Sequence, residues 1–101
     1  MKPVIFHPAA SDELEKAADD YEDEQLGLGR RFRIEFEQAL ERIKRNPLAY
    51  AIEIDQFRAC AVHRFPYTAF YADFEDHIWL AAVAHQRRRP GYWLRRKPRK
   101  Q

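Results

Sequence analysis

Several residue types that commonly define functional sites are scarce in this sequence. It has one cysteine, Cys60, so no internal disulfide can form, and a single thiol suits the reducing cytosol. The three glycines form no phosphate-binding loop, and the one serine, Ser11, lies among acidic residues, where we expect no Ser-His-Asp triad. No apolar run approaches the roughly 18–20 residues of a membrane span, and the N-terminus lacks a signal-peptide pattern. These absences predict a cytoplasmic protein without a membrane segment.

The histidines give no indication of a metal site. There are four, widely separated, and no two have the close spacing that is typical of zinc ligands. They are His7, His63, His77 and His85. We therefore expect neither a metal nor any other cofactor.

Charge is distributed unevenly along a chain whose 101 residues suit a single domain. Residues 1–28 contain eight acids but only two bases, Lys2 and Lys16, whereas residues 85–101 contain eight bases and no acid. The last part, from about 94 to 101, forms a basic tail. This asymmetry indicates an acidic or polyanionic partner at the C-terminal end, and the alternative is a solvated tail that only aids solubility.

Hydrophobic spacing predicts a short strand at Val4–Phe6 and then two helices. From Pro8 onward, apolar residues recur every three or four positions until Gly27, which we expect to end the first helix as a left-handed cap. A second apolar stripe runs from Leu28 to Ile43, and Asn46-Pro47 should stop it. The short linker predicts an antiparallel helical hairpin. Ile34 lies opposite the second stripe and is a candidate exposed apolar residue.

The second half of the chain has the patterns of strands. Ile52–Asp55 alternates, and Ala59–Arg64 should form the next strand after a turn near Gln56-Phe57. Two apolar runs, Thr68–Phe74 and Ile78–Ala84, flank a short polar turn and predict a β-hairpin whose second strand is covered on both faces. The element order predicts an α+β fold, with the N-terminal strand and helical hairpin packed on a largely antiparallel sheet of four to five strands.

One group of residues has the chemistry of a functional site. It combines guanidinium groups that match phosphate, aromatic rings on which bases can stack, and an imidazole that can move protons near neutral pH. Its members are Arg64, Tyr67, His85, Arg87, Arg88, Arg89, Tyr92 and Trp93. Two alternatives stay open: His85 can be a strand-end residue bonded to backbone, and Tyr92 and Trp93 can simply pack the C-terminal segment onto the sheet.

Several short motifs, taken together, resemble the RelE/ParE superfamily of bacterial type II toxin–antitoxin toxins. The resemblance covers nearly the whole chain, and the order and spacing of the motifs carry it. They are Phe6-His7-Pro8-Ala9-Ala10 with Glu13-Leu14, the helix Phe32 to Ile43 with Asn46-Pro47, Arg64-Phe65-Pro66-Tyr67, and Val83-Ala84-His85 with Arg88, Pro90, Tyr92-Trp93 and Arg96. The family fold, two N-terminal helices against a largely antiparallel sheet, agrees with the pattern analysis.

The resemblance implies a cytosolic toxin that is neutralised by a cognate antitoxin, with operator DNA bound only through the toxin–antitoxin complex. ParE-like members inhibit DNA gyrase, whereas RelE-like members are metal-independent ribonucleases that cut mRNA on the ribosome. The motifs Phe-His-Pro-Ala-Ala and His-x-x-Arg-x-Pro-x-Tyr-Trp are more similar to the ParE-like branch, which we favour, because the apolar middle strand Ala59–Val62 lacks the lysines and acids usual in RelE-like nucleases.

The resemblance also suggests roles for individual residues. If the protein cleaves RNA, the expected catalytic residues are His85, Arg87, Tyr92 and Arg64. The expected RNA- or target-binding residues are Arg88, Arg89, Trp93, Tyr67, Arg95 and Arg96. An antitoxin should cover the basic segment with acidic residues opposite Arg87–Arg89, or else dock along the helical hairpin near Ile34.

Overall fold

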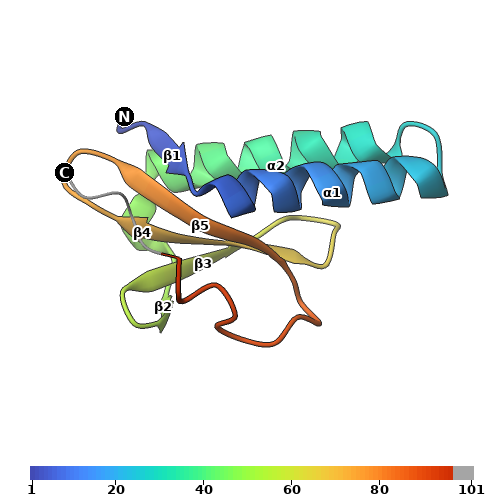
Figure 1. Ribbon diagram of the computed structural model, residues 1–101. Helices are drawn as coiled ribbons and strands as arrows, with labels where there is room; N and C mark the ends of the chain where they lie inside the picture. Colours follow the sequence, from blue (N-terminus) through green and yellow to red (C-terminus); the bar gives the residue numbers. More distant parts are fainter. Residues whose placement is uncertain (97–101) are drawn as a thin grey trace.

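The computed structural model describes residues 1–96, which form two helices packed on a five-stranded sheet (Figure 1). The helices are α1 (Pro8–Glu24) and α2 (Leu28–Arg45), followed by a short 3-10 turn, η1 (Pro47–Ala49). The strands are β1 (Val4–Phe6), β2 (Ile52–Ile54), β3 (Phe57–Ala61), β4 (Tyr67–Asp73) and β5 (Ile78–His85). Neither helix is long and apolar enough to span a membrane. The expected α+β architecture is confirmed.

Local signals fix the start of α1, whereas its end differs from the prediction. The His7 side chain accepts a hydrogen bond from the Ala9 N–H at 2.9 Å, and Pro8 opens the first turn, where its missing N–H has no cost. The helix ends at Glu24 rather than at Gly27. Gly27 has φ +87°, as a left-handed position requires, but it stands immediately before α2 and caps that helix. The predicted left-handed conformation of Gly27 is therefore confirmed. The prediction that Gly27 ends the first helix was wrong, because it precedes the second.

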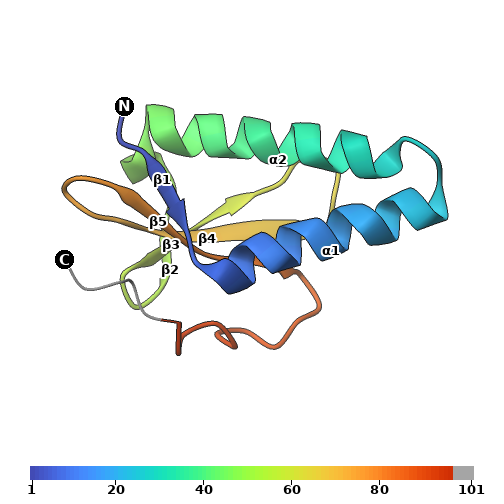
Figure 2. The same cartoon turned by 45° about the horizontal axis from the view of Figure 1, so that its top comes forward.

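The two helices approach closely near their connection. Glu22 accepts hydrogen bonds from the Gly27 and Gly29 N–H groups at 2.8 and 3.0 Å, so an α1 side chain satisfies free donors at the start of α2. A Cβ at Gly29 would stand 2.4 Å from the Ala18 carbonyl oxygen, which only glycine can avoid. Figure 2 shows the resulting antiparallel pair lying across one face of the sheet.

The strand order is β1-β5-β4-β3-β2, with β1 parallel to β5 and the other pairs antiparallel. The predicted hairpin is present as β4 and β5, and every residue of Ile78–Ala84 is buried, as expected for an interior strand. β3 begins two residues earlier than predicted because Phe57 is buried and pairs with β2, so the turn falls at Asp55-Gln56. It ends at Ala61, which leaves Arg64 in the β3–β4 loop.

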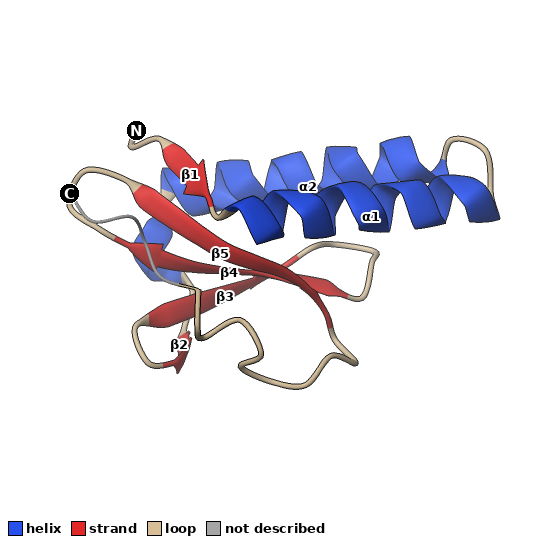
Figure 3. Ribbon diagram, in the orientation of Figure 1, coloured by secondary structure: helices blue, strands red, loops and turns tan. Residues whose placement is uncertain are grey.

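Each face of the sheet covers a separate core. On one face α1 and α2 bury the expected stripe, which includes Phe32, Phe36 and Ile43, against Tyr71 and Leu80. On the other face, no helix lies among residues 1–96. The segment after β5, which is drawn as loop in Figure 3, passes beneath the sheet and buries Trp93 there with other apolar side chains. They are Phe57, Ala72, Trp79, Ala81 and Ala82.

Candidate functional site

The end of β5 brings three of the expected site residues together. Tyr67, at the start of β4, is paired with His85, and their rings meet edge to face with centroids 5.1 Å apart. The chain then turns, and the Arg87 N–H donates to His85 Nδ1 at 3.0 Å. His85 is thus hydrogen-bonded to the backbone at the end of a strand, which was one of the two roles considered for it. Its ring nevertheless remains partly exposed.

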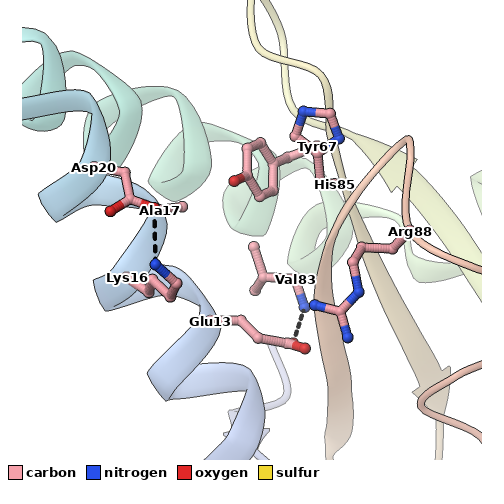
Figure 4. A pocket seen from close by; sticks show the side chains of 8 residues that line it. All are labelled: Glu13, Lys16, Ala17, Asp20, Tyr67, Val83, His85 and Arg88. Atoms are coloured by element: carbon pink, nitrogen blue, oxygen red, sulfur yellow. Dashed lines mark hydrogen bonds and ion pairs between the residues drawn. The ribbon is translucent and has the colours of Figure 1, made fainter. Parts of the chain in front are cut away.

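A pocket of about 220 Å³ opens between this strand end and α1 (Figure 4). Ala17 and Val83 form its apolar part. Its polar walls come from both sides: Glu13, Lys16 and Asp20 from α1, and Tyr67, His85 and Arg88 from the sheet and the loop that follows it. The arrangement gathers titratable groups from distant parts of the sequence, which is a common property of binding sites.

Glu13 holds the C-terminal segment in place. Its carboxylate forms a bidentate ion pair with the Arg96 guanidinium, both contacts being 2.9 Å, and accepts from the Tyr92 hydroxyl at 2.6 Å. The side chains of Glu13 and Arg96 are only 15% and 17% exposed. Bidentate, charge-assisted geometry is the strong form of such a pair. We call Glu13, Tyr92 and Arg96 the clasp.

The clasp also completes the edge of β5. The parallel strand β1 ends at Phe6 opposite Leu80, so no strand in the described part of the chain pairs with residues 81–85 of β5 on that side. Glu13 accepts from the Val83 N–H at 2.9 Å, and Arg96 donates to the Ala81 carbonyl at 3.0 Å. The two side chains therefore replace the hydrogen bonds of a missing strand, because buried backbone groups must find partners.

The clasp shifts the pKa values of its members. Burial alone would raise the pKa of Glu13, but hydrogen bonds from Arg96, Tyr92 and Val83 outweigh it, and the pKa is lowered below 4.5. Burial, together with the bond to Glu13, raises the pKa of the Tyr92 phenol, which stays protonated at neutral pH. Burial also raises the pKa of Tyr67. Neither hydroxyl can then act as a base near neutral pH.

Other expected site residues divide into exposed and buried groups. Arg87, Arg88, Arg89 and Arg95 are exposed, and the Arg88 guanidinium lies 3.9 Å above the centre of the Tyr92 ring. Arg64 is also exposed, in a left-handed backbone conformation, and its Nε lies 3.8 Å from Glu35 of α2, not at the pocket. Residues 97–101 of the predicted basic tail lie outside the described residues.

Trp93 is the buried member of the expected set, with 1% of its surface exposed. Its ring stacks on Phe70 at 4.6 Å between centroids and meets Phe57 edge to face at 4.8 Å. A ring in this position has no free face for a base or a partner, so the packing alternative describes Trp93 and we leave it out of the candidate site. Among residues 1–96, no cluster of His, Cys, Asp and Glu could hold a metal ion.

Comparison with known proteins identifies the family. The model of the ParE toxin of type II toxin–antitoxin systems matches residues 4–90. The chain belongs to the ParE toxin family. A solved structure of a chromosomal ParDE toxin–antitoxin system from P. aeruginosa has the same fold, with a TM-score of 0.59 at 16% sequence identity, over 84% of this chain and 96% of that one. No match was found among curated protein sequences.

The ParE match ends within the C-terminal segment, just before the clasp is completed. Glu13, His85 and Arg88 fall inside residues 4–90, whereas Tyr92 and Arg96 follow them. The clasp therefore connects the part of the chain that matches the ParE model to six described residues beyond it. In this ParE-family chain those residues, 91–96, cover one face of the sheet.

Glu13 is named from the sequence only within a family motif and is not predicted there as a site residue. A usable signal exists, because Glu13 stands three residues after Ala10 and four before Ala17, both on the buried stripe. A carboxylate at a stripe position must have a buried partner or lie at the edge of the core. That partner is Arg96, which is 83 residues away in the sequence. No local pattern predicts that the two side chains meet.

Proposed function

We propose that this ParE-family protein arrests bacterial growth by binding DNA gyrase, and that a cognate antitoxin neutralises it. The clasp is the observation that supports binding over cleavage. Tyr92, one of the expected catalytic residues, donates a hydrogen bond to Glu13, and the pKa of its phenol is raised. Arg96 is committed to the same carboxylate. Three neighbouring arginines of the expected site, Arg87–Arg89, remain exposed after β5 and suit electrostatic recognition of a partner.

A supercoiling assay tests the gyrase proposal. Purified gyrase is given relaxed plasmid and ATP, with folded toxin at micromolar concentration, and we expect supercoiling to fall as the toxin is titrated. Toxin pre-incubated with its antitoxin is the matched control and should leave supercoiling intact. Unchanged supercoiling with free, folded toxin would reject gyrase as the target.

A second candidate is a ribosome-dependent, metal-independent ribonuclease. It is favoured by one observation, the gathering of His85, Tyr67 and Arg88 around a single pocket, where a proton carrier stands beside a cation. The test is a translation extract programmed with one mRNA, in which primer extension detects cleavage. Cleavage together with normal supercoiling would select this candidate over gyrase.

Toxicity itself is tested by regulated expression. Induction of the toxin alone should stop growth, and co-expression of the small protein encoded beside it should restore growth. We expect operator DNA to be bound only by the complex of the two proteins. Normal growth in cells that hold folded, soluble toxin would contradict the proposed function in both of its forms.

A further inference from the structure

In the pocket between α1 and β5, the carboxylates have partners, whereas several hydrogen-bond donors do not. Its carboxylates are already engaged: Glu13 accepts from Val83, Tyr92 and Arg96, and Asp20 accepts from Lys16 at 3.1 Å. Within residues 1–96, the Tyr67 hydroxyl forms no hydrogen bond, and the Arg88 guanidinium, which stacks on the Tyr92 ring, forms no ion pair. The carboxylates of the pocket therefore already have cationic partners, whereas Tyr67 and Arg88 are free to donate.

His85 adds one more donor. Because its Nδ1 accepts from the Arg87 N–H, the neutral ring must carry its proton on Nε2. Within the described part of the chain, nothing accepts from that nitrogen. Burial raises the pKa of Tyr67, so its hydroxyl keeps its proton as well. Figure 4 shows both rings and Arg88 lining the same opening, with Lys16 and Asp20 on the opposite wall.

The helical wall of the pocket limits the kind of anion that can enter. Four exposed carboxylates of α1 have no cation within 4 Å among the described residues. They are Asp12, Asp19, Asp23 and Glu24. Asp12 and Asp19 flank the wall residues closely, within about a Debye length of the opening. A nucleic acid strand carries a phosphate at every step and would be repelled along this wall. A single carboxylate at Arg88 and His85 would meet only Glu13 and Asp20, which Arg96 and Lys16 already neutralise.

We propose that this pocket binds one carboxylate side chain, an Asp or Glu of the antitoxin, through Arg88 and His85. The inference rests on the proposed function, because it names a contact within the proposed toxin–antitoxin complex. The volume of about 220 Å³ is large enough for a carboxylate and the methylene groups that carry it. Neutralisation would follow because the antitoxin would occupy Arg88, one of the cations proposed to recognise the target.

The experiment compares two neighbouring arginines in the full-length chain. Arg88→Met removes the pocket cation that has no carboxylate partner among residues 1–96 but keeps a long side chain over the Tyr92 ring. Arg89→Met removes the same charge from an exposed position that does not line the pocket. Affinity for the co-expressed, purified antitoxin is measured by calorimetry, after circular dichroism has verified each fold. We expect Arg88→Met to weaken binding about 10- to 100-fold, as loss of a charge-assisted hydrogen bond does, and Arg89→Met about 5-fold or less.

A double-mutant cycle identifies the carboxylate. Each Asp and Glu of the antitoxin is changed to Asn or Gln, and one of these changes should reproduce the loss caused by Arg88→Met and add little to it. Equal effects of Arg88→Met and Arg89→Met, or strict additivity for every acid, would overturn the inference. A duplex oligonucleotide serves as the competing anion, and if Arg88→Met weakened only its binding, the anion would be phosphate and the inference wrong.

Failure of the inference is distinguishable from failure of the proposed function. If the wild-type chain formed no complex with the product of the neighbouring gene, both would fall together. If the complex formed tightly but was insensitive to Arg88 and to every antitoxin carboxylate, only the pocket assignment would fall.

Discussion

The two faces of the sheet are covered by different kinds of chain. One face carries α1 and α2, whose apolar stripes repeat every three or four residues and bury a continuous core. The other carries the irregular segment 91–96, which has no repeat and is held by one tryptophan and one carboxylate. The helices gain their stability from many similar apolar contacts, whereas the irregular segment depends on a few specific ones.

This difference divides the basic, aromatic end of the chain in two. Tyr92, Trp93 and Arg96 turn inward and serve the fold. Arg87, Arg88 and Arg89 remain exposed at the turn after β5. The clasp also restricts the position of that turn, because only a short stretch of chain connects the end of β5 to Tyr92. The inward residues should therefore affect stability and the outward ones recognition.

The largest expected effect on stability comes from Trp93→Ala. It removes a ring that is 1% exposed and packed between Phe57 and Phe70, and large-to-small changes of buried aromatics cost about 3–5 kcal/mol. Urea denaturation followed by circular dichroism measures the loss. Arg95→Ala, an exposed neighbour, is the control and should change the free energy of unfolding by less than about 0.5 kcal/mol. Equal stability of the two variants would mean that the segment is not part of the core.

A smaller loss is expected for Glu13→Gln. The change keeps the shape of the side chain but leaves the mostly buried Arg96 guanidinium without its countercharge, which should cost about 2–3 kcal/mol. Glu15→Gln is the matched control on the same helix, since the pair of Glu15 with Arg33 is exposed to solvent, and it should barely move the unfolding midpoint. Similar losses for both variants would contradict a special role for Glu13.

The clasp should also make stability depend on pH in the acid range. The pKa of Glu13 is lower in the folded chain than the ordinary value of 4.5. Its contribution is therefore complete above about pH 4.5 and is lost as the pH falls through the folded pKa. The difference in unfolding free energy between wild type and Glu13→Gln should shrink below pH 4.5 and be constant from pH 6 to 8. A difference that grew on acidification would contradict this sign.

On the helical face, Gly29→Ala should destabilise despite the better helix propensity of alanine. Propensity alone would favour alanine by about 1 kcal/mol, but the added Cβ would stand 2.4 Å from the Ala18 carbonyl oxygen and force the helices apart. A net loss of about 1–2 kcal/mol is expected in a thermal or urea melt. A more stable variant would mean that the helices can separate without losing their core.

The sequence predicted the helical face of the sheet better than the face covered by residues 91–96. The helical hairpin, the exposed Ile34 and the β4–β5 hairpin were predictable because each is encoded by neighbours a few residues apart. The cover of the other face was not, because the clasp joins Glu13 to Arg96 across 83 positions. The role of Trp93 had two readings in the sequence, and only its three-dimensional neighbours select between them. The structure therefore places His85 and Arg88 at the pocket but buries Trp93 in the core.

The smallest expected effect on stability, and the sharpest on function, comes from His85→Ala. The ring is partly exposed and contributes one edge contact to Tyr67 and one hydrogen bond, so its loss should cost about 1 kcal/mol or less. If the protein acts by binding gyrase, potency should fall only in proportion to affinity for the target, as for loss of one contact. If it cleaves RNA with His85 as proton carrier, cleavage should fall by about 10²- to 10⁴-fold.

Arg87→Ala is the companion variant, because it removes a neighbouring cation but no proton carrier. Single-turnover cleavage and supercoiling titrations on the two folded variants measure the difference. Full RNA cleavage by folded His85→Ala would remove this histidine from any catalytic role.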